Sequence, residues 1–217
     1  GRLSPLRDEA GIKTHQWRYN QSALIAHVRH EKPHAGKAWE IFQPQGPFAI
    51  LPLRKCTLTG MCRSGIVWTG SPEDIHRLLE LDDVNISQEL QEIFPYYGTL
   101  ELSGKRWSYP LSAMVARSTV DHRLAIVGDA AHSFHPVAGQ GLNVGFRDVA
   151  ILSDVLGEAF SLGLDLGSSY TLSTYQKKRR MDILSMTLAT DGLVRVFSNQ
   201  SRGLARVRSL GFAAVNR

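Results

Sequence analysis

The chain has 217 residues, 43% of them hydrophobic, and carries a formal net charge of +5. This length and apolar content suffice for a sizeable core in one or two domains. No stretch approaches the roughly 18 consecutive apolar residues of a membrane span and no secretory signal opens the sequence, which argues against a membrane-spanning or secreted protein.

Two cysteines, Cys56 and Cys62, are the only ones in the chain. A disulfide between them is allowed by number, but without a secretory signal they favour free thiols in a reducing compartment. They are too few for a cysteine-based zinc site. We therefore expect a cytoplasmic protein.

Residues 16–115 have the pattern of a sheet with two inserted helices. Apolar and polar residues alternate in QSALIAHVRH, WEIF, FAILPL and KRWSYPL, and residues 43–47 (QPQGP) predict a turn. Residues 71–74 (SPED) predict a helix start, with a serine cap followed by proline. A second helix is expected from near Ser87 to Phe94, before Pro95.

The next predicted elements are a strand and a helix joined by a glycine-rich loop. Leu124 to Val127 form a continuous apolar run, typical of a buried parallel strand, which ends at Gly128-Asp129. From Phe146 onward the pattern is helical. The predicted apolar face of this helix contains Phe146, Val149, Ala150, Leu152, Val155, Leu156 and Ala159.

This strand-loop-helix arrangement suits a flavin. Asp129, at the end of the strand, can accept hydrogen bonds from ribityl hydroxyls. The amides of Gly141, Leu142 and Asn143, at the positive end of the helix, can stabilise negative charge on the pyrimidine ring of a reduced flavin. Glycine is needed where a Cβ would hold the backbone away from the flat ring. The alternative is a tight strand-to-helix connection in which the glycines serve only for turning.

A metal site is a competing interpretation of the same loop. Asp129, His132 and His135 are spaced three apart, as carboxylate and histidine ligands of a metal can be. However, Pro136 interrupts any helix that would align them, and the glycines have no role in a metal site. We expect no metal: His132 fixes the loop by a hydrogen bond, and His135 faces the substrate. No motif of a hydrolase or of a nucleotide-hydrolysing enzyme is present.

Positive charge gathers at the carboxyl-terminal end. Residues 171–217 hold nine basic and two acidic side chains, a net charge of +7, which leaves −2 for the rest of the chain. Leucines and valines alternate with the charges, which favours a basic amphipathic helix on an anionic membrane surface. The alternative is a solvated helix face that packs on another part of the protein. No recognised nucleic-acid motif is present, so we expect no nucleic-acid partner.

The glycine-rich segment also resembles a known fingerprint. It has the form GDAAHxxxPxxGQGxNxGxxD, carried by Gly128, Asp129, Ala130, Ala131, His132, Pro136, Gly139, Gln140, Gly141, Asn143, Gly145 and Asp148. This is similar to the second flavin fingerprint of the single-component aromatic hydroxylases, which are FAD-dependent monooxygenases with the p-hydroxybenzoate hydroxylase fold. Gly1, Ser4 and Arg7 resemble the end of their Asp-Gly fingerprint, DGxxSxxR.

Other segments resemble the ubiquinone-biosynthesis hydroxylases in particular. These are WRYNQSALIAHVRH, WEIFQPQGPFAILPL and YQKKRRMDILSMTLATDGLVRVFS. One departure is clear: the GxGxxG motif that binds the ADP half of FAD in this family does not occur in the chain. We therefore expect a carboxyl-terminal part of a longer enzyme, inactive by itself.

The resemblance implies an α/β (α+β) fold in three segments. Residues 1–15 end a first FAD-binding segment, residues 16–115 form a mixed β-sheet substrate-binding domain, and residues 116–217 form a second FAD-binding segment with carboxyl-terminal helices. The first and third segments together make a partial FAD/NAD(P)-binding domain.

The resemblance also implies the chemistry. NAD(P)H reduces the flavin, O2 adds to form a C4a-hydroperoxyflavin, and the ring of a polyprenylated phenol is hydroxylated. Site residues implied for the flavin are Gly128, Asp129, Pro136, Gly139, Gly141, Leu142 and Asn143. Pro136 and Gln140 are expected at the reaction centre, and Leu51, Pro52 and His135 at the substrate.

The expected partners are a membrane surface and other protein chains. The basic carboxyl-terminal segment implies peripheral contact with the inner membrane, where a polyprenylated phenol would reside. A homo-oligomer or a ubiquinone-biosynthesis complex is a further expectation. The sequence leaves two alternatives to a hydroxylase of a polyprenylated phenol: a hydroxylase of the same fold for a soluble aromatic compound, and a non-catalytic lipid-binding or assembly subunit.

Overall fold

The computed structural model describes residues 1–55 and 60–197. The chain divides into two compact units. Unit 1 combines Gly1–Arg18 with Ser112–Arg195, and the described part of unit 2 is mainly Tyr19–Leu111. Strands β1 (Thr14–His30) and β6 (Trp107–Ala116) each contribute residues to both units.

Unit 2 is built on an antiparallel sheet. In the whole seven-stranded sheet the order is β2-β3-β4-β1-β6-β9, and β5 pairs with β1. The strands of unit 2 other than β1 and β6 are β2 (Trp39–Gln43), β3 (Gly46–Leu53), β4 (Cys62–Gly70) and β5 (Leu100–Leu102). The predicted turn at residues 43–47 is confirmed, because Pro44 and Gln45 connect β2 to β3. Gly46 has a φ of +147°, and a Cβ there would lie 2.7 Å from Thr69 Cγ2, so glycine is required.

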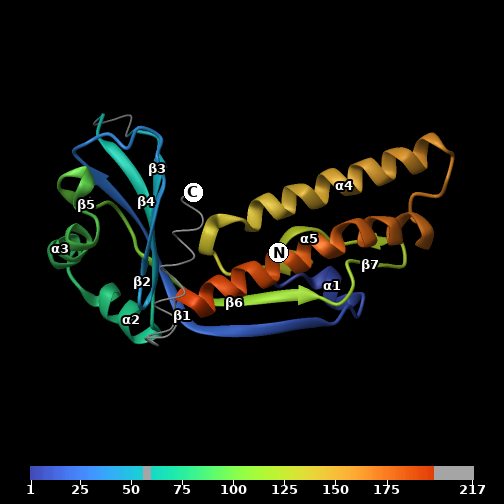
Figure 1. The fold of residues 1–217 in the computed structure, drawn as a ribbon, viewed down its shortest axis with the longest axis horizontal. Helices are drawn as coiled ribbons and strands as arrows, with labels where there is room; N and C mark the ends of the chain where they lie inside the picture. Colours follow the sequence, from blue (N-terminus) through green and yellow to red (C-terminus); the bar gives the residue numbers. More distant parts are fainter. Residues whose placement is uncertain (56–59, 198–217) are drawn as a thin grey trace. The chain divides into compact units, whose positions relative to one another are not determined.

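Two helices cover one face of this sheet (Figure 1). Helix α2 (Pro72–Glu80) begins as predicted, with the Ser71 hydroxyl accepting from the Asp74 N–H at 3.0 Å. Helix α3 (Asp83–Ile93) begins four residues before the predicted start, because the Asp82 carboxylate caps it through the Asn85 N–H at 2.8 Å. A short 3-10 turn, η1 (Pro95–Tyr97), follows.

The core of unit 2 lies between the sheet and these helices. Alternation along β1 places Leu24, Ala26 and Val28 on the buried face, while Ile25 and His27 lie half-buried on the other face. The helices and their flanks contribute Ile75, Leu78, Ile86, Leu90 and Phe94 to the same core.

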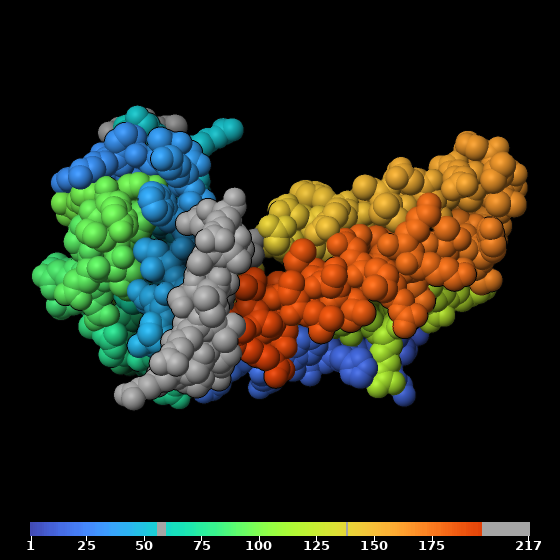
Figure 2. All heavy atoms as spheres, in the orientation of Figure 1, coloured from blue at the N-terminus to red at the C-terminus, as the bar shows by residue number. Residues whose placement is uncertain are grey.

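Unit 1 contains two long helices and several short elements. Helices α4 (Gly141–Ser161) and α5 (Ser169–Phe197) lie side by side (Figures 1 and 2), and Arg147 on α4 contacts Asp182 on α5 at 2.8 Å. The short elements are α1 (Pro5–Glu9), β7 (Val120–Asp121), β8 (Leu124–Ala125), η2 (Gly128–Ala130), β9 (His132–Ser133) and η3 (Val137–Gly139). A small core of Ile12, Ala116, Ile126 and Ala131 joins several of them.

Two sequence predictions for unit 1 are wrong in detail. The strand expected over Leu124–Val127 is only the two residues of β8, which pairs antiparallel with β7 through a tight turn at His122-Arg123. The apolar face expected for α4 (Gly141–Ser161) is wrong at Phe146, whose side chain is 63% exposed. Ala150 and Val149 are also exposed, because α4 buries a narrower stripe along Val144, Asp148, Val155 and Ala159.

Two further features concern helix hydrophobicity and the cysteines. Within residues 1–55 and 60–197, no helix combines the length and the apolar character that crossing a bilayer requires. Cys62 is a buried free thiol, and Cys56 lies outside the described residues.

Candidate functional site

The loop after β8 presents an acidic side chain beside a close backbone approach. Asp129 lies exposed within η2. The preceding Gly128 has a φ of +56°, and a Cβ on Gly145 of α4 would lie 3.5 Å from the Cα of Gly128. Gly128 therefore serves backbone conformation, as the alternative interpretation of the glycine pattern proposed for the whole loop, whereas a Cβ on Gly145 would make only an ordinary van der Waals contact.

The amino-terminal end of α4 is open. The predicted residues Gly141, Leu142 and Asn143 form its first turn, and Gln140 at the cap position provides no side-chain cap. Helix-start amides have no intrahelical acceptor and carry partial positive charge. Leu142 is 70% exposed, and a Cβ on Gly141 would meet no atom within 4 Å. This end can therefore accept an anionic or hydrogen-bond-accepting group.

Asp148 connects this helix end to the rest of unit 1. Its carboxylate is fully buried and accepts from Gly128 N at 2.8 Å and from His132 Nε2 at 2.6 Å, both on Oδ2. Arg179 Nε of α5 donates to Oδ1 at 2.6 Å. One carboxylate thus joins η2, β9, α4 and α5. The expectation that His132 fixes the loop by a hydrogen bond is met in this way.

The electrostatics of this group keep Asp148 ionised. Burial alone would raise the pKa of the Asp148 carboxyl, but the hydrogen bonds from His132, Gly128 N–H and Arg179 together hold that pKa below its ordinary value. Burial also disfavours the charge on Arg179, yet its bonds to Asp182 and Asp148 outweigh burial and raise the pKa of the guanidinium. The result is a satisfied buried ion pair.

Two further side chains brace the loop. Arg7 of the amino-terminal segment is only 3% exposed and donates from Nη1 to the carbonyl of Ala130 at 3.3 Å. Tyr175 of α5 donates from its hydroxyl to the carbonyl of Ile126 at 3.2 Å. The backbone is therefore held on both sides of Asp129.

His135 and Pro136 follow β9. Burial lowers the pKa of His135 to about 4, so its ring is neutral at pH 7. Its Nδ1 accepts from Val137 N at 3.1 Å, which places the ring proton on Nε2. Pro136 is exposed and precedes η3, where Gly139 has a φ of +59°. Gln140 Oε1 accepts from Asn143 Nδ2 at 3.1 Å.

The structure brings most of the predicted site residues together in unit 1. Residues 128–143 form one continuous loop and helix start. The predicted substrate residues Leu51 and Pro52 instead lie on β3 of unit 2, where Leu51 is 42% exposed. Their role at the substrate stays a prediction.

Sequence reasoning missed the contribution of α5. Arg179 belongs to the basic run Lys177–Arg180, which predicted a charged surface, but it is 3% exposed and pairs with Asp148. The helical spacing of Tyr175, Arg179 and Asp182 was the available signal, since residues separated by four and three positions share a face. Among the described residues, no three His, Cys, Asp or Glu side chains are grouped as metal ligands would be.

The donor set fits the riboflavin half of FAD. An exposed carboxylate suits ribityl hydroxyls, and an uncapped helix start with free space beside Gly141 suits the pyrimidine edge of the ring. A family model described as an FAD-binding domain matches residues 1–187. The chain belongs to this FAD-binding domain family. The resemblance inferred from the fingerprint is thereby confirmed.

Curated relatives are similar over the whole chain. Ubiquinone hydroxylase UbiL of Rhodospirillum rubrum is 45% identical over 218 residues, covering 100% of this chain and 49% of the relative. The 3-demethoxyubiquinol 3-hydroxylase of Escherichia coli is 37% identical and the human ubiquinone biosynthesis monooxygenase COQ6 is 31% identical, with 54% and 52% of those relatives covered. The chain spans about half the length of the curated relatives it matches.

Solved structures share the fold at low identity. PqsL of Pseudomonas aeruginosa superposes with a TM-score of 0.71 at 19% identity, covering 95% of this chain and 57% of that chain. The Diels-Alderase PyrE3 gives a TM-score of 0.71 at 18% identity, with 100% and 45% covered. These matches confirm the α+β fold.

Proposed function

We propose that this chain carries the flavin-ring half of an FAD-dependent monooxygenase that hydroxylates a polyprenylated phenol in ubiquinone biosynthesis. The observation that carries the proposal is the open start of α4 beside exposed Asp129, in a chain 45% identical to a ubiquinone hydroxylase. NAD(P)H and O2 are the co-substrates that we propose. When bound, the flavin supplies the redox chemistry and the activation of oxygen.

The residues of this chain orient the cofactor and stabilise its charge. Asp129 would accept hydrogen bonds from the ribityl chain. The amides of Gly141, Leu142 and Asn143 would face the pyrimidine edge, where a helix start stabilises negative charge. The exposed Pro136, with its fixed φ, would limit the space beside the ring. Asp148 holds this geometry without touching the cofactor.

Fewer residues are expected to contact the substrate. A neutral His135 with its proton on Nε2 can donate a hydrogen bond to a phenolic oxygen but does not carry positive charge at pH 7. Gln140, four residues after Pro136, would add an amide near the reaction centre. Leu51 and Pro52 supply apolar surface on β3 for an aromatic ring.

Measurement of FAD in the full-length protein tests the assignment of Asp129. The substitution Asp129→Ala should weaken FAD binding roughly tenfold or more, because a hydrogen bond to a charged group contributes about 1.5–3 kcal/mol. Asp154→Ala, another exposed acid, on α4, is the matched control and should leave FAD content unchanged. Equal FAD affinity in the two variants would remove Asp129 from the site.

Substrate chain length separates the proposed substrate from a soluble aromatic one. A polyprenylated phenol should be hydroxylated with a higher kcat/KM than its short-chain analogue, because the chain adds apolar burial. The opposite preference supports the hydroxylase of a soluble aromatic compound. Absence of turnover with FAD bound supports the non-catalytic subunit.

We further propose that the exposed part of the basic segment contacts an anionic membrane surface. Lys177, Lys178 and Arg180 are exposed on α5, whereas Arg179 is buried in its ion pair. A test by charge removal must therefore spare Arg179. Sedimentation with phosphatidylglycerol vesicles should decrease in Lys177→Gln/Lys178→Gln and not in Lys105→Gln, an exposed lysine of unit 2. Equal sedimentation of the two would contradict membrane contact through α5.

A further inference from the structure

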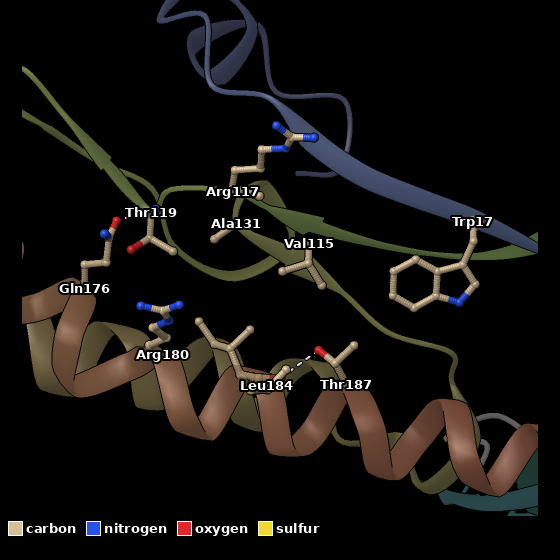
Figure 3. Close-up of a pocket in the computed structure, with 11 residues that line it drawn as sticks. Trp17, Val115, Arg117, Thr119, Ala131, Gln176, Arg180, Leu184 and Thr187 are labelled. Atoms are coloured by element: carbon tan, nitrogen blue, oxygen red, sulfur yellow. Dashed lines mark hydrogen bonds between the residues drawn. The ribbon is translucent and has the colours of Figure 1, made fainter.

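A cavity of about 430 Å³ lies within unit 1 between β6 and α5 (Figure 3). Helix α5 lines it with Gln176, Arg180, Leu184 and Thr187, which share one face at spacings of four and three residues. None of the residues predicted to hold the flavin lines this cavity. Its volume is in the range of small-molecule sites, about 300–1,000 Å³.

One end of the cavity offers hydrogen-bond donors. Gln176 Oε1 already accepts from Ser118 Oγ at 2.7 Å and from Thr119 N at 3.0 Å. The Gln176 side chain therefore has its NH2 group left to bind a ligand. The Arg180 guanidinium points from α5 toward Thr119 (Figure 3), and it makes no ion pair or hydrogen bond with any residue of the described ranges.

No carboxylate of this chain neutralises that end. No Asp or Glu lines the cavity. The two segments outside the described residues, 56–59 and 198–217, contain no Asp or Glu in their sequence. Arg117 also lines the cavity, but its side chain points away from α5 (Figure 3). A guanidinium at the edge of apolar surface favours an anion with paired oxygens, such as a carboxylate.

The remainder of the cavity is apolar. Val115 and Ala131 form the wall opposite Leu184, and Trp17 lies beyond them (Figure 3). The Trp17 indole is held by a hydrogen bond from Nε1 to Asp191 Oδ1 at 3.1 Å. Asp191 also pairs with Arg195 through Oδ2 at 2.7 Å, so both oxygens of this nearby carboxylate are engaged away from Arg180.

We propose that this cavity binds a single-chain amphiphile with a carboxylate head group. Arg180 and the Gln176 NH2 hold the carboxylate, and the hydrocarbon chain extends past Leu184 toward Trp17. The ligand is bound and not converted, so this site is separate from the flavin chemistry proposed above.

Calorimetry on the FAD-loaded full-length protein tests the proposal with decanoate below its micellar concentration. Decanoate should bind, while acetate and decyltrimethylammonium, which lack the chain or the anionic head, should not. Arg180→Gln should weaken decanoate binding roughly tenfold, because one charge-assisted hydrogen bond is lost. Lys105→Gln, an exposed lysine of unit 2, is the control of equal charge change and should bind like the unmodified protein.

Fluorescence locates the bound chain. Bromine quenches a nearby indole, so 11-bromoundecanoate should quench tryptophan emission, and Trp17→Phe should remove most of that quenching. Thr187→Phe, which fills the apolar end, should abolish binding while FAD absorbance is retained. Equal affinities in Arg180→Gln and Lys105→Gln, unchanged quenching in Trp17→Phe, or no decanoate binding by protein that retains its FAD would each overturn the proposal. Because FAD is measured in the same samples, these outcomes are distinct from a failure of the flavin assignment.

Discussion

The ion pair between Arg179 and Asp148 should be the most sensitive point of unit 1. In Arg179→Met the Asp148 carboxylate would stay fully buried without its counter-charge. Removal of one partner from a buried pair costs about 3–5 kcal/mol. Asp148 would keep its bonds from Gly128 N and His132, so we expect the lower end, about 3 kcal/mol of unfolding free energy.

A surface arginine on the neighbouring helix provides the control. Arg147 contacts the same Asp182 that Arg179 contacts, at 2.8 Å, but its side chain is 44% exposed. An exposed pair contributes about 0–1 kcal/mol, so Arg147→Met should leave the urea midpoint almost unchanged. Urea unfolding of the full-length protein, followed by far-UV circular dichroism, gives the midpoint of each variant. The midpoints report stability when the dependence of unfolding free energy on urea concentration is the same in both variants.

The pH dependence gives an independent check of the same pair. The lowered pKa of Asp148 contributes stability above its unfolded pKa, and this contribution is lost as pH falls through the folded value. A protonated Asp148 needs no counter-charge, so the difference between the unmodified protein and Arg179→Met should shrink in acid. Equal effects of Arg179→Met and Arg147→Met at pH 7 would refute the assignment of Arg179 as the buried partner.

Three other predictions rest on single residues. The folded pKa of His135 is about 4 against an ordinary value of 6.5, so the unfolded state binds more protons than the folded state between pH 4 and 6.5. The unfolding free energy should therefore fall as the pH drops from 6.5 to 4. In urea titrations at pH 7.5 and 5, His135→Gln should reduce that fall. Gly128→Ala should cost about 1 kcal/mol because its φ is +56°, and it should lower bound FAD, measured by absorbance. Ser71→Ala removes the α2 cap and should lower the unfolding free energy by about 1 kcal/mol, with FAD content unchanged. A loss of FAD in this variant would contradict the expectation that the effect of the substitution stays within unit 2.

Local signals in the sequence predicted local structure well. Ser71 and Pro72 indicated the start of α2, and the turn between β2 and β3 was expected from its prolines and glycine. Each of these depends on a few neighbouring residues, so no information from distant parts of the chain was needed. The amides of residues 141–143 were likewise expected at a helix start, and they are the first turn of α4.

Predictions that depended on distant partners did less well. The apolar run Leu124–Val127 predicted a parallel strand, but whether such a run pairs parallel or antiparallel depends on which strand lies beside it, and β7 is the described partner. The side of α4 that faces inward was also missed: Phe146 is apolar but exposed, while the charged Asp148 is buried. Burial of a charge depends on partners that arrive from elsewhere in the chain, here His132 and Arg179.

The charge pattern of α5 is explained by its helical phase. Tyr175, Arg179 and Asp182 share the face that braces Asp148 and the backbone at Ile126. The residues one position later along α5, Gln176 and Arg180, line the cavity between α5 and β6. Adjacent arginines therefore have different surroundings, since successive residues of a helix point about 100° apart. A count of basic residues treats Arg179 and Arg180 as equivalent, whereas the structure makes one a buried structural partner and leaves the other available to bind an anion.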